Sequence, residues 1–497
     1  MKQAVRILLL LVTGIGFFGC APKELPSVNL FITTDIEGVF WSRPEPRYGN
    51  EVTGGLSILK SFLDRQTTPF LLLEGGNWFA QTPEGTLSQG GYFNQAARAI
   101  PYSGRLFTEK DLAYGWRSLA SIIKESPAPF VLSNVVLSNG RVPEGVRPWL
   151  LQEVGSYKIG VIGLVSAQSL KGKHRLGGLK ILPEAETARK TIQLLKEKGA
   201  QVIVALAAMD TEEKKSSLTA TELAEEVEGI DILVTSDLNH EDAEVRQLGR
   251  TLLVYPGSRL DSVGRVQLFF QKNGELAYSQ FENVVLYKRD FGEDEEVALQ
   301  IAELRRAARS QMSRPVGKTE QALIGKLDGE SDLGNWAADC LRKWAKADAA
   351  VINASSLRDQ LPEGVVTQYD LYKVYPYSDH VTYLTIKGNA LKKALEEGLS
   401  VADNFAQISG MKVHYTQQAG IAKITTVQVG DKPLSPNATY RVAVTDHLLA
   451  GGAGHDGFID SLEFKNTQVE MGTVLRLCLA GNKPVGKPTR GRWSMRP

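Results

Sequence analysis

Short apolar runs alternate with segments of helical periodicity through roughly the first 290 residues. Alternating apolar strands and helices are typical of a layered α/β domain. Residues 264–286 are predicted to form edge strands that close this domain. The predicted strands are 28–33, 70–73, 130–132, 158–165, 202–207 and 230–234, and the helices between them include 55–65, 185–198 and 219–228.

A charged segment without Gly or Pro follows at 294–313 and ends before Pro315. Its apolar residues recur at helical spacing, which predicts a connecting helix over 294–314. A chain of 497 residues is too long for one hydrophobic core. We therefore predict a first domain at 27–290 and a smaller mixed α/β domain at 316–497. The second domain is predicted to have helices near 333–346 and 388–399 and strands near 349–352, 411–415 and 440–444.

The charges of the chain nearly cancel, with 57 basic and 56 acidic side chains. Such a chain has no global field that would attract nucleic acid or anionic lipid, so we predict neither as a main partner. An apolar content of 43% and a charged content of 23% exclude the disordered and collagen-like classes.

The first twenty residues have the pattern of a secretory signal: a basic start, then an apolar run at 7–18. That run is shorter than the about 20 residues that span a bilayer. Phe17-Phe18-Gly19-Cys20 resembles the bacterial lipobox, which implies lipidation of Cys20. We expect an exported protein anchored on the periplasmic side, with the outer membrane favoured because no Asp follows the Cys. An ordinary signal cut nearby and an uncleaved anchor are the alternatives.

Two further cysteines, Cys340 and Cys478, lie in the last third of the chain. A disulfide between them is possible in an oxidising compartment, and two separate buried thiols are equally compatible with the sequence.

The sequence lacks the motifs of several common chemistries. The Gly-rich stretch 451–454 is followed by His455 rather than Lys-Ser or Lys-Thr, so it is not a P-loop. No Cys pair has zinc spacing, and no nucleophile-elbow motif is present.

The order of several short motifs resembles the bacterial 5′-nucleotidase family. The motifs are Thr33-Thr34-Asp35-Ile36-Glu37-Gly38, Leu73-Glu74-Gly75-Gly76-Asn77, Glu330-Ser331-Asp332-Leu333-Gly334-Asn335, Tyr375-Pro376-Tyr377-Ser378-Asp379 and Ile408-Ser409-Gly410. The resemblance covers roughly residues 27 to 497. It implies a calcineurin-like metallophosphoesterase domain, a four-layer β-sandwich flanked by helices. A connecting helix and a 5′-nucleotidase C-terminal domain would follow.

Members of the family hydrolyse nucleotides with two metal ions that hold a water and the phosphate. Carried over position by position, the family's Asp, His, Asn and Asp ligands are mostly replaced here. The opening Asp is kept as Asp35, a His becomes Glu37, and the bridging Asp becomes Asn77. The remaining ligand positions fall on Glu109, Ala208, Asp237 and Asn239. Lys110 replaces the family's transition-state His, and Ala113 replaces the Asp that supports that His.

These replacements argue against a working two-metal centre. Ala208 cannot ligate, and Lys110 adds a positive charge. At about 5 Å from a dication, with an effective dielectric of about 20, the repulsion is about 6 to 7 kcal/mol. Three interpretations stay open. Lys110 could pair with Asp35, Glu37 or Asp237; the oxygen-rich remnant could bind one Mg²⁺ or Ca²⁺; or the site could be a solvated polar cleft.

The second domain carries candidate nucleotide-binding residues. Tyr377 stands at a base-stacking position of the family, His447 stands at the second such position, and Arg358 matches a family arginine. Lys326 is the nearest basic residue before Glu330. The family's ribose-binding Asp becomes Ala453.

The leading hypothesis is a non-catalytic envelope lipoprotein of this family that binds a ligand or serves as a scaffold, with no cofactor. A phosphoester hydrolase with a rebuilt single-cation site is the alternative. A nucleotide or nucleoside is the expected ligand, and a role purely as an assembly partner is the third hypothesis. The sequence does not indicate which protein would be that partner.

Overall fold

The computed structural model describes residues 25–79, 82–166, 178–209, 218–236, 242–401, 404–418, 421–481 and 483–495. The predicted signal peptide with Cys20, and the candidate site residues Asp237 and Asn239, lie outside the described residues. In the part described, no helix is both long enough and apolar enough to cross a bilayer.

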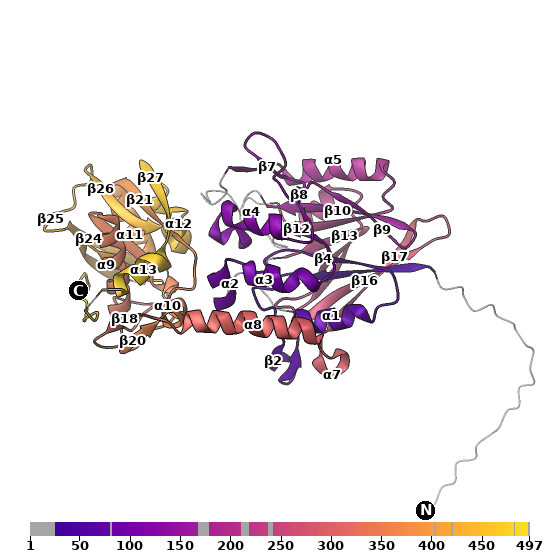
Figure 1. Cartoon of the computed structure of the whole chain (residues 1–497). Helices are drawn as coiled ribbons and strands as arrows, with labels where there is room; N and C mark the ends of the chain where they lie inside the picture. Colours follow the sequence, from indigo (N-terminus) through magenta and orange to yellow (C-terminus); the bar gives the residue numbers. More distant parts are fainter. Residues whose placement is uncertain are drawn as a thin grey trace, which may run out of the picture.

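The first domain contains two mixed sheets that face each other (Figure 1). The first sheet has the order β17 (Leu276–Val285), β16 (Ser262–Phe270), β1 (Ser27–Thr33), β4 (Phe70–Glu74), β5 (Tyr102–Arg105), β6 (Phe130–Val131) and β8 (Val146–Arg147). The second has the order β14 (Glu244–Leu248), β15 (Thr251–Tyr255), β13 (Ile232–Thr235), β12 (Val202–Ala208), β10 (Tyr157–Val165) and β9 (Leu150–Val154). Two small pairs join β2 (Arg43–Glu45) to β3 (Glu51–Thr53) and β7 (Val135–Leu137) to β11 (Leu179–Ile181).

Alternation along β12 shows how the layers form. Val202, Val204 and Leu206 pack into the core between the two sheets, whereas Ile203 and Ala205 pack outward against a separate cluster. Both sets are fully buried because helices cover the outer face. The helices of this domain are α1 (Leu56–Asp64), α2 (Pro83–Ser88), α3 (Gly91–Ala96), α4 (Trp116–Glu125), α5 (Glu184–Glu197), α6 (Ala220–Glu226) and α7 (Lys288–Phe291).

The predicted connecting segment forms α8 (Glu295–Met312), which runs from the first domain to the second (Figure 1). The Asp294 side chain caps its first turn by accepting from the Val297 N–H. Val297, Ile301 and Leu304 are buried as their spacing predicts, and they join the first-domain core.

The second domain is built on a five-stranded sheet of order β22 (Ala406–Ser409), β19 (Ala349–Asn353), β26 (Thr439–Thr445), β21 (His380–Lys387) and β27 (Glu463–Glu470). A four-stranded sheet has the order β25 (Lys432–Pro433), β24 (Ile421–Val429), β23 (Met411–Gln418) and β28 (Trp493–Met495), and β18 (Pro315–Thr319) pairs with β20 (Gly364–Thr367). The helices are α9 (Asp332–Ala345), α10 (Gln368–Val374), α11 (Gly388–Ser400), α12 (Asp446–Leu449) and α13 (Met471–Leu479).

A disulfide joins Cys340 on α9 to Cys478 on α13, with 5.8 Å between the two Cα atoms. The structure thus decides between the two arrangements that the sequence left open.

The predicted α/β class is confirmed, with one correction to the edge strands at 264–286. Only β17 lies at an edge, because β16 pairs with β1 on its other side. The apolar alternation of β16 reflects burial between two neighbouring strands.

Candidate functional site

The first candidate site lies where β1 and β4 end. These strands are parallel neighbours, with Thr33 opposite Glu74. Their pairing continues into the loops: the Gly75 N–H donates to the Thr33 carbonyl at 2.8 Å, and the Asp35 N–H donates to the Gly76 carbonyl at 3.0 Å. The Glu37 N–H then donates to the Asn77 carbonyl at 2.9 Å. Backbone bonds therefore bring together three residues that the sequence assigned to the metal site.

Asp35 and Asn77 contact each other directly through their side chains. The Asn77 Nδ2 donates to Asp35 Oδ1 at 2.6 Å, and both residues are buried. Asp35, Glu37 and Asn77 have φ values of 45°, 54° and 58°, in the left-handed region that favours glycine. Such strained positions persist only where the surrounding structure holds them, and they cluster at functional sites.

Asp111 ties a third loop, which follows β5, to the other two. Its carboxylate accepts from the backbone N–H groups of Asn77 (2.7 Å), Trp78 (3.0 Å) and Thr108 (2.9 Å). Burial raises the pKa of Asp111 to about 6, although these hydrogen bonds oppose the shift. The sequence analysis did not single out Asp111, because these bonds depend on the fold.

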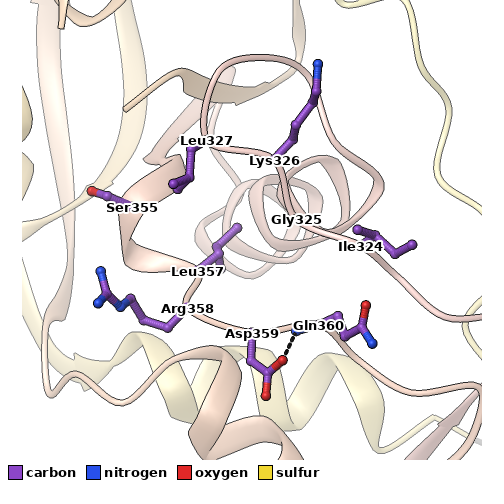
Figure 2. Close-up of a pocket in the computed structure, with 9 residues that line it drawn as sticks. All are labelled: Ile324, Gly325, Lys326, Leu327, Ser355, Leu357, Arg358, Asp359 and Gln360. Atoms are coloured by element: carbon purple, nitrogen blue, oxygen red, sulfur yellow. Dashed lines mark hydrogen bonds between the residues drawn. The ribbon is translucent and has the colours of Figure 1, made fainter. Parts of the chain in front are cut away.

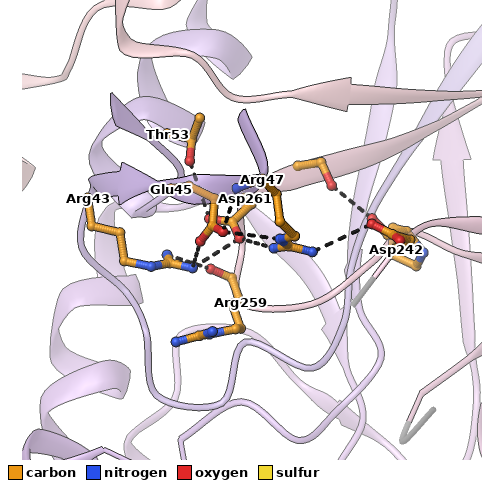
Figure 3. A network of polar contacts seen from close by, with 9 residues as sticks. Arg43, Glu45, Arg47, Thr53, Asp242, Arg259 and Asp261 are labelled. Atoms are coloured by element: carbon orange, nitrogen blue, oxygen red, sulfur yellow. Dashed lines mark hydrogen bonds and ion pairs between the residues drawn. The ribbon is translucent and has the colours of Figure 1, made fainter. Parts of the chain in front are cut away.

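A fourth loop approaches from the end of β15. The Arg259 N–H donates to the Asp35 carbonyl at 2.7 Å, and Arg259 also has a left-handed φ of 59°. Figure 3 shows the polar network that fixes this loop: Arg43 and Arg47 both pair with the buried Asp261 carboxylate. Arg43 lies in β2 and Arg47 lies just after it, so the network attaches the β2–β3 hairpin to the site. Nothing in the motifs indicated this clamp.

A buried arginine, Arg105, lies beneath the loops. Arg105 is fully buried, and its guanidinium carbon lies 4.3 Å from the centre of the Trp78 ring. Its Nη1 donates to Asn94 Oδ1 and Ser126 Oγ, each at 3.1 Å. Glu74 stands opposite Arg105 in the sheet, and burial raises the pKa of Glu74 well above its ordinary value.

The other predicted positions that the structure describes lie around the same edge. Glu109, Lys110 and Ala113 lie in the partly buried loop after β5, and Ala208 ends β12. Asp237 and Asn239 fall outside the described residues. The predicted pairing of Lys110 with a carboxylate stays a prediction.

The donor set of the described residues does not fit a two-metal centre. The amide of Asn77, which the motif comparison assigns to the position of the family's bridging carboxylate, donates a hydrogen bond to Asp35 and so competes for its oxygen. The Ala208 methyl group cannot ligate an ion. Within the described ranges, no group of three or more His, Cys, Asp or Glu side chains is placed to hold a metal ion.

The second candidate site lies at one edge of the second domain, where β19 and β26 end and β21 begins. The Asn404 Oδ1 accepts from the Ser355 hydroxyl at 2.7 Å, and its Nδ2 donates to the Ala453 carbonyl at 3.1 Å. The Arg358 N–H donates to the Val374 carbonyl at 2.9 Å, close to the loop that carries Tyr377. These bonds join the segments on which the sequence placed its nucleotide-binding candidates.

A pocket of about 460 Å³ opens at this edge and is lined by both Arg358 and Lys326, whose charged ends point in different directions (Figure 2). The two side chains come from different loops of the domain. The Arg358 guanidinium has no ion pair or hydrogen bond with the described residues, whereas Lys326 pairs with Asp328 at 3.3 Å. The pocket is lined by Ile324, Gly325, Lys326, Leu327, Ser355, Leu357, Arg358, Asp359 and Gln360.

Tyr377 and His447 lie outside the lining of this pocket. Tyr377 is 40% exposed, and its ring makes an edge contact with Tyr375. His447 is exposed on α12, which is tied to the Tyr377 loop because the His380 N–H donates to Asp446 Oδ1 at 3.0 Å. The sequence candidates therefore divide between the pocket and its surroundings.

Comparison with known proteins gives matches over both domains. Residues 315–460 match the model of the 5′-nucleotidase C-terminal domain. The chain is 25% identical to the 5′-nucleotidase of Vibrio cholerae, with 98% of each chain covered. It is also 25% identical to the trifunctional nucleotide phosphoesterase protein YfkN of Bacillus subtilis, over 64% of this chain but only 23% of that protein.

The fold is similar to that of a Staphylococcus aureus structure, assigned as a 5′-nucleotidase and solved with α-ketoglutarate. The TM-score is 0.75 at 17% identity, and 94% of this chain and 99% of that chain are covered. The resemblance inferred from the motifs is thereby confirmed: the second domain matches the 5′-nucleotidase C-terminal domain, and the chain is similar to a 5′-nucleotidase over nearly its whole length.

Proposed function

We propose that this chain is a non-catalytic 5′-nucleotidase-family protein of the cell envelope whose second domain binds a nucleotide or nucleoside. The observation that carries the proposal is the pocket that holds both Arg358 and Lys326. Two cationic side chains at one pocket suit a ligand with a phosphate group.

Arg358 is the main candidate for phosphate recognition. A guanidinium presents several donors in a planar fork, and that of Arg358 is not engaged by any described residue. The half-exposed ring of Tyr377, on a neighbouring segment, offers a surface on which a base can stack. The relatives named above support a nucleotide as the ligand class, since their names specify nucleotide substrates.

Loss of hydrolysis is the second part of the proposal. It is supported by the Asn77 amide at the bridging position and by Ala208 at a ligand position. Such a protein would retain the two-domain scaffold for binding or for assembly in the envelope.

The proposed location rests on the leader and on the disulfide. Export through residues 1–20 and lipidation of Cys20 would place the chain at a membrane surface, where each buried methylene contributes about 0.8 kcal/mol. The Cys340–Cys478 bridge supports an oxidising compartment.

Calorimetry with AMP, adenosine and α-ketoglutarate tests the binding proposal. We expect Arg358→Met to weaken AMP binding by roughly tenfold or more, because hydrogen bonds to charged groups contribute about 1.5 to 3 kcal/mol. Adenosine lacks the phosphate, so Arg358→Met should weaken adenosine binding less than AMP binding. Arg476→Met, which removes an exposed arginine of the same domain, is the matched control. Equal AMP affinity in wild type and Arg358→Met would contradict the assignment.

Phosphate release from AMP tests the loss of catalysis. The purified mature protein should release no phosphate with Mg²⁺, Mn²⁺, Zn²⁺ or Ca²⁺. Turnover that disappears in Asp35→Ala would overturn the proposal.

A hydrolase with a single cation is the second candidate. The observation in its favour is Asn77 Oδ1, a buried acceptor beside Asp35 that has no hydrogen-bond partner among the described residues. Oxygen ligands of this kind suit Mg²⁺ or Ca²⁺. Metal content by mass spectrometry separates the two candidates, and less than one ion per chain after desalting would count against this one.

A further inference from the structure

We propose that Asn77 takes the structural place of a bridging ion, so that this edge of the first domain holds its shape without metal. The inference rests on the proposed loss of the two-metal centre and concerns what replaces it. It assigns a role to one amide–carboxylate pair, Asn77 with Asp35.

The geometry of the pair is that of a strong buried hydrogen bond. Asn77 Nδ2 and Asp35 Oδ1 are 2.6 Å apart, and the two residues are 0% and 2% exposed. A buried carboxylate is costly unless donors satisfy it, and a neutral amide supplies one donor without adding charge.

The charge balance explains why Asn is suited to this position. An Asp in place of Asn77 would put two carboxylates at contact distance inside the protein. Like charges that close disfavour joint ionisation, and a bound cation would be needed to hold both. The amide removes the second charge and turns a repulsive contact into an attractive one.

The backbone supplies the remaining support that an ion would give. Cross-loop hydrogen bonds hold Asp35 and Glu37 at their left-handed φ values, and Asp111 fixes the N–H groups of Asn77 and Trp78. The Arg259 N–H holds the Asp35 carbonyl from a fourth loop. The protein's own bonds thus connect the four loops that converge at this edge.

Thermal unfolding of the full mature chain tests the inference. We expect the Tm of the wild type to change by less than about 1 °C on adding EDTA, Mg²⁺, Mn²⁺ or Zn²⁺, since an ion raises the Tm only when it binds the folded state more tightly than the unfolded chain. In EDTA, Asn77→Asp should lower the Tm by roughly 5 °C or more, because it makes two buried carboxylates adjacent.

The swapped pair is the decisive variant. Asp35→Asn combined with Asn77→Asp restores one amide and one carboxylate, and should recover most of the lost Tm in EDTA. If Asn77→Asp alone fails to fold, folding of the swapped pair is the readout. The control is Asn134→Asp, at a fully buried Asn whose Nδ2 donates to the carbonyls of Val165 and Leu182. Adding Asp35→Asn to that control should recover nothing.

Three results would overturn the inference: a wild-type Tm that falls in EDTA or rises with an ion, an Asn77→Asp variant as stable as wild type in EDTA, or a swapped pair no better than the single variant. Ion-dependent stability without phosphate release would leave the proposed function standing. Phosphate release from a protein whose Tm is indifferent to ions would overturn the proposed function alone.

Discussion

At the scale of single residues, we expect His455 to make the stability of the second domain depend on pH. It is fully buried, its Nδ1 donates to the Ala394 carbonyl at 2.8 Å, and its Nε2 has no hydrogen-bond partner among the described residues. Burial lowers the pKa of His455 below its ordinary value. Protonation would therefore place an unpartnered charge in the core.

The sign of the effect follows from the direction of this shift. Below about pH 6.5 the unfolded chain binds a proton that the folded protein resists, so the free energy of unfolding falls as the pH falls towards the folded-state pKa. Urea unfolding between pH 8 and 5 checks this. We expect the stability difference between wild type and His455→Phe to shrink by up to about 1.4 kcal/mol per pH unit in that window. A constant difference would contradict the prediction.

At the scale of elements, α8 is held to the first domain by more than its apolar face. The Arg305 Nε lies 3.3 Å from Glu84 Oε1 on α2, and its guanidinium carbon lies 4.0 Å from the centre of the Trp41 ring. Glu84 is nearly buried, so losing its partner leaves a poorly solvated carboxylate.

We expect Arg305→Met to lower the free energy of unfolding by about 2 kcal/mol, allowing for the partial exposure of the arginine. Arg306→Met, at the next and exposed position of the same helix, should change it by less than about 0.5 kcal/mol. Equal effects of the two substitutions in urea unfolding would show that the Glu84 and Trp41 contacts contribute nothing.

At the scale of the whole molecule, one covalent link spans much of the second domain. Cys340 and Cys478 are 138 residues apart, and closing a loop of that length stabilises the fold by up to about 5 kcal/mol in the chain-entropy model.

Dithiothreitol, or Cys340→Ser with Cys478→Ser, should lower the Tm of the second domain and leave the Tm of the first domain nearly unchanged. Titration of thiols in the denatured, unreduced protein checks the bond, and two free thiols from Cys340 and Cys478 would contradict it.

Much of the fold could be predicted from the sequence because local patterns determine it. The apolar spacing of α5 and α8 and the continuous apolar run of β12 each predict their element from neighbouring residues alone. Other parts depend on contacts distant in sequence. The position of β16 inside the sheet depends on its pairing with β1, and the disulfide depends on how α9 packs against α13.

The residues of the candidate site also divide into those that local motifs identify and those whose contacts join distant parts of the sequence. The motifs identified Asp35, Glu37 and Asn77, and they identified Arg358 and, as the nearest basic residue before Glu330, Lys326. They could not reveal that Asn77 donates to Asp35, or that Asp111 and Arg259 secure the loops, because those bonds join segments 33 to 224 residues apart.

The backbone pairing that continues β1 and β4 into their loops bears on how this molecule could have evolved. Main-chain groups at 33–38 and 75–78 supply most of those bonds, and main-chain groups are the same whatever side chain a position carries. Exposed or half-exposed positions nearby, such as Glu37 and Glu109, could therefore drift in identity while the frame around them stayed intact. A lineage can thus change the side chains at this edge, and with them its chemistry, while it keeps the architecture that positions them.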